Sequence, residues 1–329
     1  MSKALRTASI VGTGMYVPEK VMTNHDLEKL VDTSDEWIFT RTGMKERRVA
    51  AGDQATSSMA AAAAEKALAD AGVSAEDVDL IVVATMTPDM QMPSTACRVQ
   101  DKIGASNAYC YDLSAACTGF LYGLQTVKAQ IESGAVETAL VIGAEKMSSC
   151  VDWDDRTTCV LFGDGAGAAV LRAGDKKFGI TDAVCGSNGK LWELLHIPAG
   201  GSAKPLTADL LADHQQCLKM GGREVFKHAV KSMVTSSFAA LEKNGLTMDD
   251  IALVIPHQAN VRIINAIVDR VGSPEKVFIN LEKYGNTSGA TLGIALDEAR
   301  REGRVKEGDL VLLTAFGGGF TWGAMVLEL

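Results

Sequence analysis

Two stretches of the chain repeat one pattern of hydrophobic and polar positions. In each stretch, apolar residues at helical spacing run up to a glycine, and a short apolar segment follows a few residues later. A glycine just past a helical stretch is typical of a helix end, and a short apolar run is typical of a buried strand. The matching residues, 173 positions apart, are Ala67-Leu68 and Ala240-Leu241, Gly72-Val73-Ser74 and Gly245-Leu246-Thr247, Asp77-Val78 and Asp250-Ile251, and Leu80 and Leu253. The pattern predicts a helix–strand unit that occurs twice.

A second stretch repeats at an offset of 169 residues. Its matching pairs, each with helical spacing between them, are Cys117-Thr118 with Asn286-Thr287 and Gly134 with Gly303. Because both repeats keep the same order along the chain, we interpret them as a duplicated α/β unit with halves at residues 1–172 and 173–329. This interpretation places Cys117 and Asn286 at equivalent strand-to-helix corners, which are expected to meet near a pseudo-twofold axis.

Three further patterns place elements around these corners. A helix is predicted to open at Cys117 and end at Gly134, with Phe120, Leu121, Leu124, Val127 and Ile131 on its buried face. Residues 251–255 predict a buried strand that ends just before His257. Residues 310–327 carry no charge, but glycines interrupt them, and this favours two strands around a tight turn over a membrane helix.

Composition and charge narrow the class of protein. A length of 329 residues with 47% apolar content is sufficient for two fused hydrophobic cores. The formal net charge of −9 argues against nucleic acid or an anionic membrane as partner, because phosphate-rich surfaces select for basic proteins. The first 17 residues contain only a short apolar stretch and no signal-peptide core. We therefore expect a cytoplasmic protein that binds neither nucleic acid nor membranes.

The seven cysteines form no Cys-x-x-Cys pair and the histidines show no zinc-ligand spacing, so no metal site is expected. Most of the cysteines are interpreted as small buried hydrophobic residues. Cys117 differs because it stands at the start of a helix, where free amides and the helix dipole favour a thiolate and lower the pKa from ~8.5. We predict that Cys117 is a nucleophile; the alternative is a structural cysteine in the core.

His257 and Asn286 are the candidate partners of Cys117. His257 follows the predicted strand at residues 251–255, and α/β proteins place their chemistry at the carboxyl ends of strands. Taken alone, His257 would be a structural hydrogen-bonding residue and Asn286 a loop cap. Because all three residues stand at strand-to-helix corners, they predict a catalytic site.

Two glycine-rich segments lie nearby in the sequence. Residues 162–168 read Phe-Gly-Asp-Gly-Ala-Gly-Ala and resemble a dinucleotide fingerprint, but a strand follows them. That fingerprint works by offering a helix N-terminus to pyrophosphate, so we expect a turn and no nicotinamide. Residues 315–320 join two predicted strands, and their glycines allow the amide of Gly318 to face an oxyanion.

Together these motifs resemble β-ketoacyl-acyl carrier protein synthase III, a family of thiolase-fold condensing enzymes. The resemblance runs nearly end to end and rests on residues 32–38, 40–43, 112–120, 162–167, 256–260, 285–288 and 316–323. It implies a five-layered αβαβα fold, a homodimer and no cofactor, since CoA enters as part of a substrate. The implied reaction joins a short acyl-CoA, with acetyl-CoA expected, to malonyl-acyl carrier protein and thereby starts fatty-acid synthesis.

The resemblance also implies roles for individual residues. Cys117 would carry the acyl group, with its own amide and that of Gly318 as the oxyanion hole, while His257 and Asn286 would stabilise the enolate formed on decarboxylation. Contacts to CoA are implied for Thr33, Trp37, Arg41, Arg156 and Asn260, with Trp37 and Arg156 on either side of the adenine. An aromatic face and a guanidinium plane suit a purine. The alternative for Trp37 is a partly buried structural anchor.

A basic stripe is the candidate docking surface for the acidic carrier protein. Arg223, Lys227 and Lys231 recur every four residues on a predicted helix, and the resemblance adds Arg262. The alternative is an ordinary solvated helix face. For the primer pocket we expect Met92 and Phe316. Met92 stands where a phenylalanine often limits this pocket from across the dimer, so propionyl, branched and longer primers stay open.

Other functions stay open as well. A thiolase-fold synthase of secondary metabolism, of the quinolone, polyketide or olefin type, would share Cys117, His257 and Asn286 but take other acyl-CoAs. A non-catalytic scaffold would have no need of these three residues together. A degradative thiolase is disfavoured, because it uses a second reactive cysteine near the C-terminus and the last cysteine here is Cys217.

Overall fold

The computed structural model describes residues 6–174 and 176–329. Its strands are β1 (Thr7–Tyr16), β2 (Val21–Thr23), β3 (Glu46–Arg48), β4 (Leu80–Ala84), β5 (Tyr109–Leu113), β6 (Thr138–Lys146), β7 (Asp164–Gly174), β8 (Val184–Ser187), β9 (Leu195–His196), β10 (Lys219–Met220), β11 (Leu253–Pro256), β12 (Leu310–Gly317) and β13 (Thr321–Glu328). Its α-helices are α1 (Asn24–Leu27), α2 (Asp35–Thr42), α3 (Thr56–Ala71), α4 (Thr95–Ile103), α5 (Gly119–Ser133), α6 (Ala208–Ala212), α7 (Gly222–Lys243), α8 (Val261–Val271), α9 (Leu281–Tyr284) and α10 (Thr291–Arg301). Short 3-10 helices are η1 (Ala75–Asp77), η2 (Ala116–Thr118), η3 (Met147–Ser149), η4 (Gly189–Leu194), η5 (Met248–Asp250), η6 (Pro274–Lys276) and η7 (Ser288–Ala290).

Two sheets with the same strand order form the centre of the molecule. The first sheet has the order β1-β7-β6-β4-β5, and the second has the order β8-β13-β12-β11. In both sheets the first three strands pair antiparallel, and the fourth strand pairs parallel with the third. Val277 makes a parallel bridge to Val254 at the place that β5 occupies in the first sheet. The repeated order confirms the predicted duplication; the boundary expected after residue 172 lies within β7 and stays a prediction.

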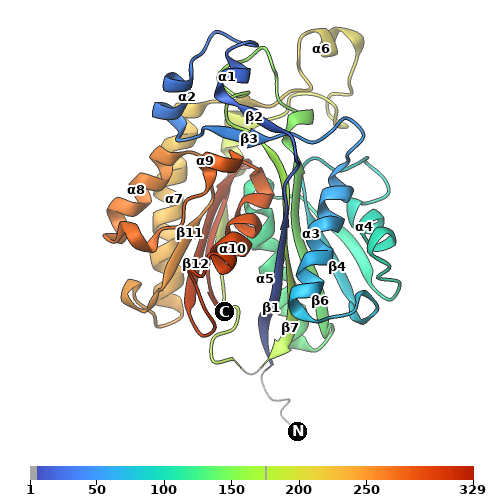
Figure 1. Ribbon diagram of the computed structural model, residues 1–329, viewed down its shortest axis with the longest axis vertical. Coiled ribbons are helices and arrows are strands. Elements are labelled where there is room, and N and C mark those ends of the chain that lie inside the picture. The colour runs from blue at the N-terminus through green and yellow to red at the C-terminus, as the bar shows by residue number, and fades with distance from the viewer. Residues whose placement is uncertain (1–5, 175) are drawn as a thin grey trace.

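The elements stack in five layers, as the αβαβα expectation required. Figure 1 shows α7 and α8 on one outer side, the second sheet, the pair α5 and α10, the first sheet, and α3 and α4 on the other outer side. Helix α3 packs on β1 and β7, and α7 packs on β12 and β13. The strands β12 and β13 confirm the two strands predicted for residues 310–327. No helix in the described part of the chain is long and apolar enough to cross a membrane.

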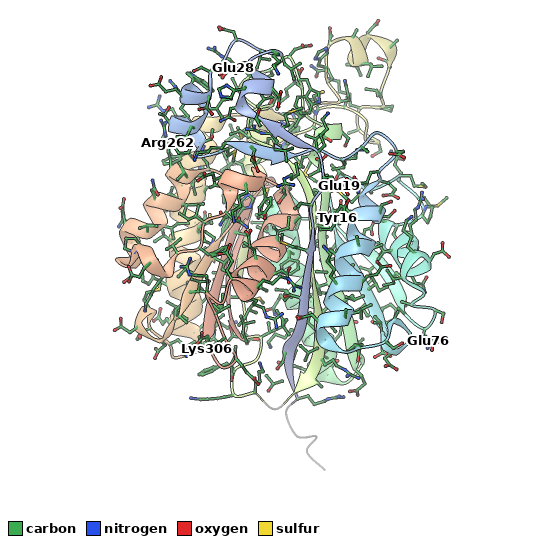
Figure 2. The ribbon with its side chains drawn as sticks, viewed as in Figure 1. Tyr16, Glu19, Glu28, Glu76, Arg262 and Lys306 are labelled. Atoms are coloured by element: carbon green, nitrogen blue, oxygen red, sulfur yellow. The ribbon has the colours of Figure 1, made fainter. Side chains whose placement is uncertain are left out.

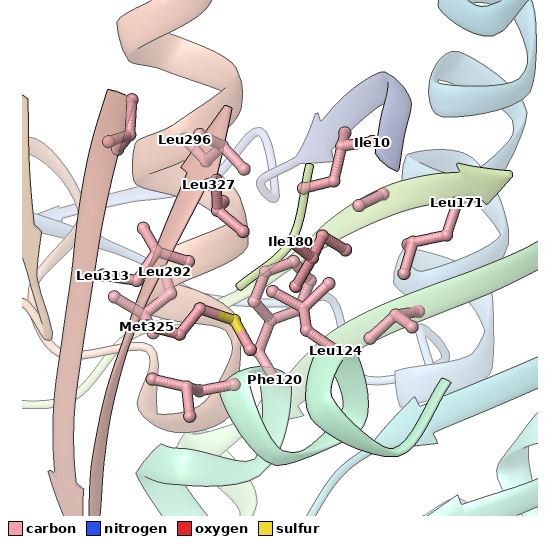
Figure 3. Close-up of a cluster of buried hydrophobic side chains, with 14 of the residues drawn as sticks. Ile10, Phe120, Leu124, Leu171, Ile180, Leu292, Leu296, Leu313, Met325 and Leu327 are labelled. Atoms are coloured by element: carbon pink, nitrogen blue, oxygen red, sulfur yellow. The ribbon is translucent and has the colours of Figure 1, made fainter. Parts of the chain in front are cut away.

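The hydrophobic core between the two sheets joins the halves (Figure 3). It combines Leu171 from the first sheet, Leu313 from the second, and Phe120 and Leu292 from the two helices of the middle layer, all fully buried. Burial of such a side chain contributes about 1.5–3 kcal/mol. Because both halves share this core, the strand-to-helix corners at its end are held at a fixed separation.

The strand-to-helix corners before α5 and α10 are equivalent in the two halves, but the residues that match are not the predicted ones. Ala116 and Ser288, 172 positions apart, both have a left-handed backbone, with φ of 47° and 48°. Each begins a 3-10 helix that leads directly into α5 or α10. Cys117 therefore corresponds to Gly289, and the predicted equivalence with Asn286 is wrong. The offset falls from 172 at these corners to 169 at Gly134 and Gly303, because α10 has 11 residues where α5 has 15, and Glu302 stands between α10 and Gly303.

The glycine-rich segment at residues 162–168 is largely a strand, and the prediction of a turn was wrong. Strand β7 begins at Asp164, and its Gly167 lies against Gly293 of α10. A β-carbon on Gly167 would come within 2.3 Å of the Gly293 backbone. The glycines therefore allow a helix of the middle layer to approach the sheet closely.

Candidate active site

One cavity of about 820 Å³ is lined by residues of both halves. Cys117, His257, Asn286 and Gly318 all line this cavity. They come from η2, from the loop after β11, from the loop before η7 and from the turn between β12 and β13. The structure thus brings together the four residues at which the sequence predicted chemistry.

Cys117 lies in η2, between β5 and the start of α5, and is 8% exposed. The left-handed backbone of Ala116 turns the chain sharply at this point. The end of β12 packs against the turn so closely that a β-carbon on Gly317 would lie 2.7 Å from the amide nitrogen of Cys117. The thiol donates a hydrogen bond to the Oγ of Ser288 at 3.5 Å. Cys117 is therefore a buried thiol at the start of a helix, inside the cavity.

Burial raises the pKa of the Cys117 thiol to about 12. The hydrogen bond with Ser288 acts in the opposite direction, and the charge of Glu145 raises the pKa further. The predicted lowering of this pKa is wrong for the free thiol, because loss of water disfavours the anion more than the start of α5 favours it. Attack by this sulfur therefore needs a proton acceptor.

His257 directly follows β11 and is held at its backbone and at its ring. Its amide donates to the carbonyl of Thr314 at 2.8 Å, and its Nδ1 lies 2.6 Å from the Oγ1 of Thr291. Within the described chain the Thr291 hydroxyl has no other acceptor, so we assign its proton to this bond and the ring hydrogen to Nε2. Burial lowers the pKa of His257 to about 3, so the ring is neutral. A neutral ring of this tautomer can donate a hydrogen bond from Nε2.

Asn286 is positioned by the loop that leads into β7. Its amide donates to the carbonyl of Leu161 at 2.8 Å, and its carbonyl accepts from the amide of Gly163 at 3.1 Å. A β-carbon on Gly163 would lie 2.4 Å from the carbonyl oxygen of Tyr284, so this contact requires glycine. The side-chain Oδ1 accepts from the amide of Ser288 at 2.8 Å, which leaves Nδ2 as a donor.

Gly318 lies in the turn between β12 and β13. Its amide donates to no acceptor within residues 6–174 and 176–329. A β-carbon at this position would lie 3.8 Å from the Cβ of Ala116, so the amide belongs to the immediate surroundings of Cys117. An unpaired amide beside a nucleophile is what an oxyanion hole requires. The assignment of the Cys117 and Gly318 amides to that hole stays a prediction.

Three of the five residues expected to bind CoA line the same cavity, namely Trp37, Arg41 and Asn260. Thr33 and Arg156 do not line it. The guanidinium carbons of Arg41 and Arg156 lie 4.4 and 5.3 Å from the ring centroid of Trp37. Because Arg156 contacts the Trp37 ring directly and donates to the carbonyl of Asp32 at 2.6 Å, a purine between the two requires this guanidinium to move.

Comparison with known proteins identifies the family. Residues 111–189 match 3-Oxoacyl-[acyl-carrier-protein (ACP)] synthase III, and residues 241–329 match its C-terminal part. The Beta-ketoacyl-[acyl-carrier-protein] synthase III of Caldanaerobacter subterraneus subsp. tengcongensis is 52% identical over 322 residues, which cover 98% of this chain and 97% of the relative. The chain belongs to the 3-oxoacyl-[acyl-carrier-protein] synthase III family. Membership confirms the resemblance inferred from the motifs and the expectation of an acyltransferase.

Solved structures of synthase III relatives agree with the fold. The crystal structure of 3-oxoacyl-[acyl-carrier-protein] synthase III from Aquifex aeolicus VF5 superposes with a TM-score of 0.91 at 51% identity and covers 98% of this chain and 100% of that one. The priming beta-ketosynthase of the R1128 polyketide biosynthetic pathway superposes with a TM-score of 0.92 at 37% identity and covers 100% of this chain and 98% of that one. The thiolase-like duplicated fold is thereby confirmed.

The basic residues proposed for docking divide into two groups in this synthase III chain. Arg223, Lys227 and Arg262 line the cavity, whereas Lys231 does not. Lys227 also pairs with Glu224 at 2.7 Å. Figure 2 shows Arg262 at the periphery of the molecule beside α2, where its Nη2 lies 3.5 Å from the carbonyl of Thr40. Basic side chains therefore line part of the cavity, and docking of the carrier protein on them stays a prediction.

The two residues expected in the primer pocket lie in different surroundings. Phe316 is buried, lines the cavity and packs against Phe320 with the ring centroids 4.8 Å apart and the ring planes tilted by 55°. Met92 is 84% exposed and lies outside the cavity of its own chain. The assignment of Met92 and Phe316 to a primer pocket stays a prediction.

The sequence interpretation missed three residues that contact the site. Ser288 stood inside the Gly-Asn-Thr-Ser motif but was assigned no role, although its hydroxyl contacts Cys117. Thr291 orients His257 from the first turn of α10, and no local pattern distinguishes it. Glu145 accepts a hydrogen bond from Ser288 at 3.2 Å. Its signal was a carboxylate that directly follows the apolar run of β6, because a carboxylate is rarely buried unless it is paired.

Three residues of the kind that bind metal ions lie close together outside the cavity. Asp152, Asp154 and His214 bring three possible ligand atoms within 4.8 Å of one another. The Asp152 carboxylate already contacts His214 at 2.8 Å and Lys219 at 3.1 Å. These contacts satisfy the Asp152 carboxylate and account for the closeness of the three residues without a metal ion.

Proposed function

We propose that this protein catalyses the decarboxylative condensation of a short acyl-CoA, with acetyl-CoA expected, with malonyl-acyl carrier protein. The products are 3-oxoacyl-acyl carrier protein, CO2 and CoA, and the reaction starts fatty-acid synthesis. The observation that carries the proposal is the convergence of Cys117, His257 and Asn286 on one cavity, in a chain of the synthase III family. A thiol, a neutral imidazole and a free carboxamide together supply one nucleophile and two hydrogen-bond donors.

In the first half-reaction, the Cys117 sulfur attacks the thioester carbonyl of acyl-CoA. The tetrahedral oxyanion accepts hydrogen bonds from the amides of Cys117 and Gly318, and its collapse expels CoA as a thiolate that takes up a proton. The unpaired Gly318 amide beside the Cys117 corner supports this assignment. The product is an acyl thioester on Cys117.

In the second half-reaction, malonyl-acyl carrier protein occupies the same cavity. The Nε2 of His257 and the Nδ2 of Asn286 donate to its thioester oxygen, and loss of CO2 leaves the electron pair as an enolate stabilised by these two bonds. The enolate carbon attacks the acyl carbonyl on Cys117, and the thiolate leaves. The bonds of Thr291 to Nδ1 and of the Ser288 amide to Oδ1 support these roles, because they direct the remaining donors toward substrate.

Substrate and partner contacts follow from the cavity and its rim. Trp37, Arg41 and Asn260 contact CoA, with Thr33 and Arg156 completing the nucleotide site once Arg156 moves from the Trp37 ring. Arg223, Lys227 and Arg262 receive the acidic carrier protein. The protein works in the cytoplasm without a cofactor as a homodimer, in which the exposed Met92 of one protomer reaches the primer pocket of the other. The exposure of this large apolar side chain supports the dimer.

A second candidate is a priming synthase of a polyketide pathway, favoured by one observation. The R1128 priming beta-ketosynthase is 37% identical over the whole of this chain. Such an enzyme would use the same three residues with a longer or branched acyl-CoA. The higher identity of 52% to a beta-ketoacyl-[acyl-carrier-protein] synthase III favours fatty-acid synthesis.

The deciding experiment measures 3-oxoacyl-carrier protein formed from malonyl-carrier protein and acyl-CoAs of increasing length. We expect the highest kcat/KM with acetyl-CoA, and a maximum at longer chains would favour the second candidate. Mass mapping of the acylated protein should place the acyl group on Cys117. Cys117→Ala should abolish loading, while Cys159→Ala, which removes another buried thiol, should not. An acyl group on a different cysteine would overturn the mechanism.

A further inference from the structure

Cys117 is the end of a hydrogen-bonded chain that leads away from the substrate cavity. Its thiol donates to the Oγ of Ser288 at 3.5 Å, and the Ser288 hydroxyl donates to the Oε1 of Glu145 at 3.2 Å. The three groups come from η2, η7 and the end of β6, and all three residues are buried. Within the described chain, Ser288 is the hydrogen-bond partner of the Cys117 sulfur. The direction of the two bonds provides a path for a proton from sulfur to carboxylate.

Glu145 is a buried carboxylate held by donors that carry no charge. Its Oε2 accepts from the hydroxyl and the amide of Thr87 at 2.6 and 3.1 Å, from the amide of Met86 at 3.1 Å and from the hydroxyl of Thr85 at 3.2 Å. Oε1 faces Ser288 and lies 3.3 Å from the position of a β-carbon on Gly289. Among the described residues, none of the basic side chains forms an ion pair with Glu145. Burial raises the pKa of Glu145 to about 7, so either protonation state is accessible near neutrality.

We propose that Ser288 relays the proton of the Cys117 thiol to Glu145 when the sulfur attacks. The S–H bond breaks as Ser288 Oγ takes that proton, and the original Ser288 proton forms a new O–H bond on Glu145 Oε1. The electron pair of the S–H bond becomes the nucleophile. The group of three keeps one negative charge throughout, so no second charge has to be accommodated in a dry site. Ser288 touches the reacting sulfur, whereas Glu145 acts only through Ser288.

The alternative acceptor would be His257, and its surroundings do not suit that task. Its Nδ1 is occupied by Thr291, and the tautomer assigned above places a hydrogen on Nε2. No hydrogen bond joins His257 to the Cys117 sulfur among the described residues. The burial that lowers the pKa of His257 to about 3 also makes the ring a poor base. Glu145 is thus the acceptor to which the thiol is connected.

The relay also balances the protons of the proposed function, on which this step rests. Decarboxylative condensation consumes one proton, because the thiolate expelled from Cys117 must be reprotonated. A proton kept on Glu145 while the acyl group occupies Cys117 can return through Ser288 at that moment. The CoA thiolate then takes its proton from solvent.

The test measures the rate at which iodoacetamide alkylates Cys117, read from the mass of the Cys117 peptide, as a function of pH. This reagent requires no acyl-CoA. In the wild type we expect the rate to reach a plateau above the pKa of Glu145, about 7, because the ionised carboxylate then accepts the proton. Glu145→Gln and Ser288→Ala should lose this plateau: the rate at pH 7.5 falls about tenfold or more and keeps rising with pH as the thiol itself ionises.

Controls separate the relay from charge and from packing. The titratable groups that respond to the charge of Glu145 are the buried thiols of Cys117 and Cys150. If Glu145 acted only by its charge, Glu145→Gln would make Cys117 react faster. Asp164→Asn is the matched control. Asp164 begins β7, the strand beside β6, is also buried, and accepts a hydrogen bond from a serine hydroxyl, that of Ser148, at 2.6 Å. It should leave the profile unchanged, and Glu145→Asp should restore a plateau.

An unchanged or faster alkylation profile in Glu145→Gln overturns the relay. If that variant does not fold, Ser288→Ala, which removes one hydroxyl, decides alone. The solvent isotope effect on its alkylation should be smaller than that of the wild type. An equal isotope effect overturns the proposal. If the two variants lose the plateau but the wild type loads no acyl-CoA, the relay stands and the proposed function is overturned. If the wild type condenses at a normal rate but the variants keep the plateau, the proposed function stands and the relay is overturned.

Discussion

The Oγ1 of Thr291 lies 2.6 Å from Nδ1 of His257, and this hydrogen bond joins the first residue of α10 to the residue after β11. It fixes both the orientation and the tautomer of the ring. We predict that Thr291→Val slows condensation by about tenfold, the loss of a hydrogen bond worth roughly 1.5 kcal/mol. Acyl loading of Cys117 should be unchanged. Thr291→Ser, which keeps the hydroxyl, is the control, and equal condensation rates in both variants would contradict the assignment.

Removing either donor to the thioester oxygen should separate the two half-reactions. His257→Ala or Asn286→Ala is expected to slow decarboxylation of malonyl-carrier protein by about 10²–10³-fold, since an oxyanion donor contributes about 3–4 kcal/mol. Loading should fall much less, because its oxyanion binds to the amides of Cys117 and Gly318. Release of labelled CO2 and single-turnover acylation measure the two steps. A parallel loss in both would refute the division of roles.

Charge reversal on the cavity rim tests carrier-protein docking. Lys227→Glu and Arg262→Glu should raise KM for malonyl-carrier protein about tenfold and leave KM for free malonyl-CoA unchanged, because only the protein substrate carries an acidic surface. The effect should weaken at high salt. Lys102→Glu on α4 makes the same charge change on the opposite outer layer and should have no effect. If it raises KM equally, the rim does not recognise the carrier protein.

The buried imidazole predicts a dependence of stability on pH. The pKa of His257 is lowered to about 3 by burial, against about 6.5 in the unfolded chain. Its contribution is therefore fully present above pH 6.5 and is lost as the pH falls toward 3, by about 1.4 kcal/mol per unit. Urea unfolding at pH 7.5 and pH 5 should show a larger loss in the wild type than in His257→Gln. Equal losses would mean that the ring is protonated in the native state.

Much of the fold could be predicted because its signals are local. The repeat of Leu80 at Leu253 marked β4 and β11, which occupy equivalent places in the two sheets, and the glycines of residues 317–319 marked the turn between β12 and β13. The register between the halves was harder. The predicted match of Cys117 with Asn286 followed sequence similarity, whereas the matching backbones of Ala116 and Ser288 depend on how each chain turns into its helix.

For the site, residue types and motifs indicated the nucleophile and its two partners, and the structure places them around one cavity. The electrostatics were predicted with the wrong sign for Cys117. A helix start is visible in sequence, but the pKa of the thiol responds to all the groups that exclude water from it, and these come from distant segments.

The sequence alone determined the duplicated α/β architecture and singled out Cys117, His257 and Asn286, because hydrophobic periodicity and short motifs are written along the chain. Only the tertiary structure decided that Ser288 and Glu145 connect to Cys117, that Thr291 orients His257, and that Arg223 and Lys227 reach the cavity whereas Lys231 does not. The reason is physical. A hydrogen bond forms only when donor and acceptor are placed to within a few tenths of an ångström, and here the two groups come from residues far apart in sequence. The packing of the shared core sets those distances.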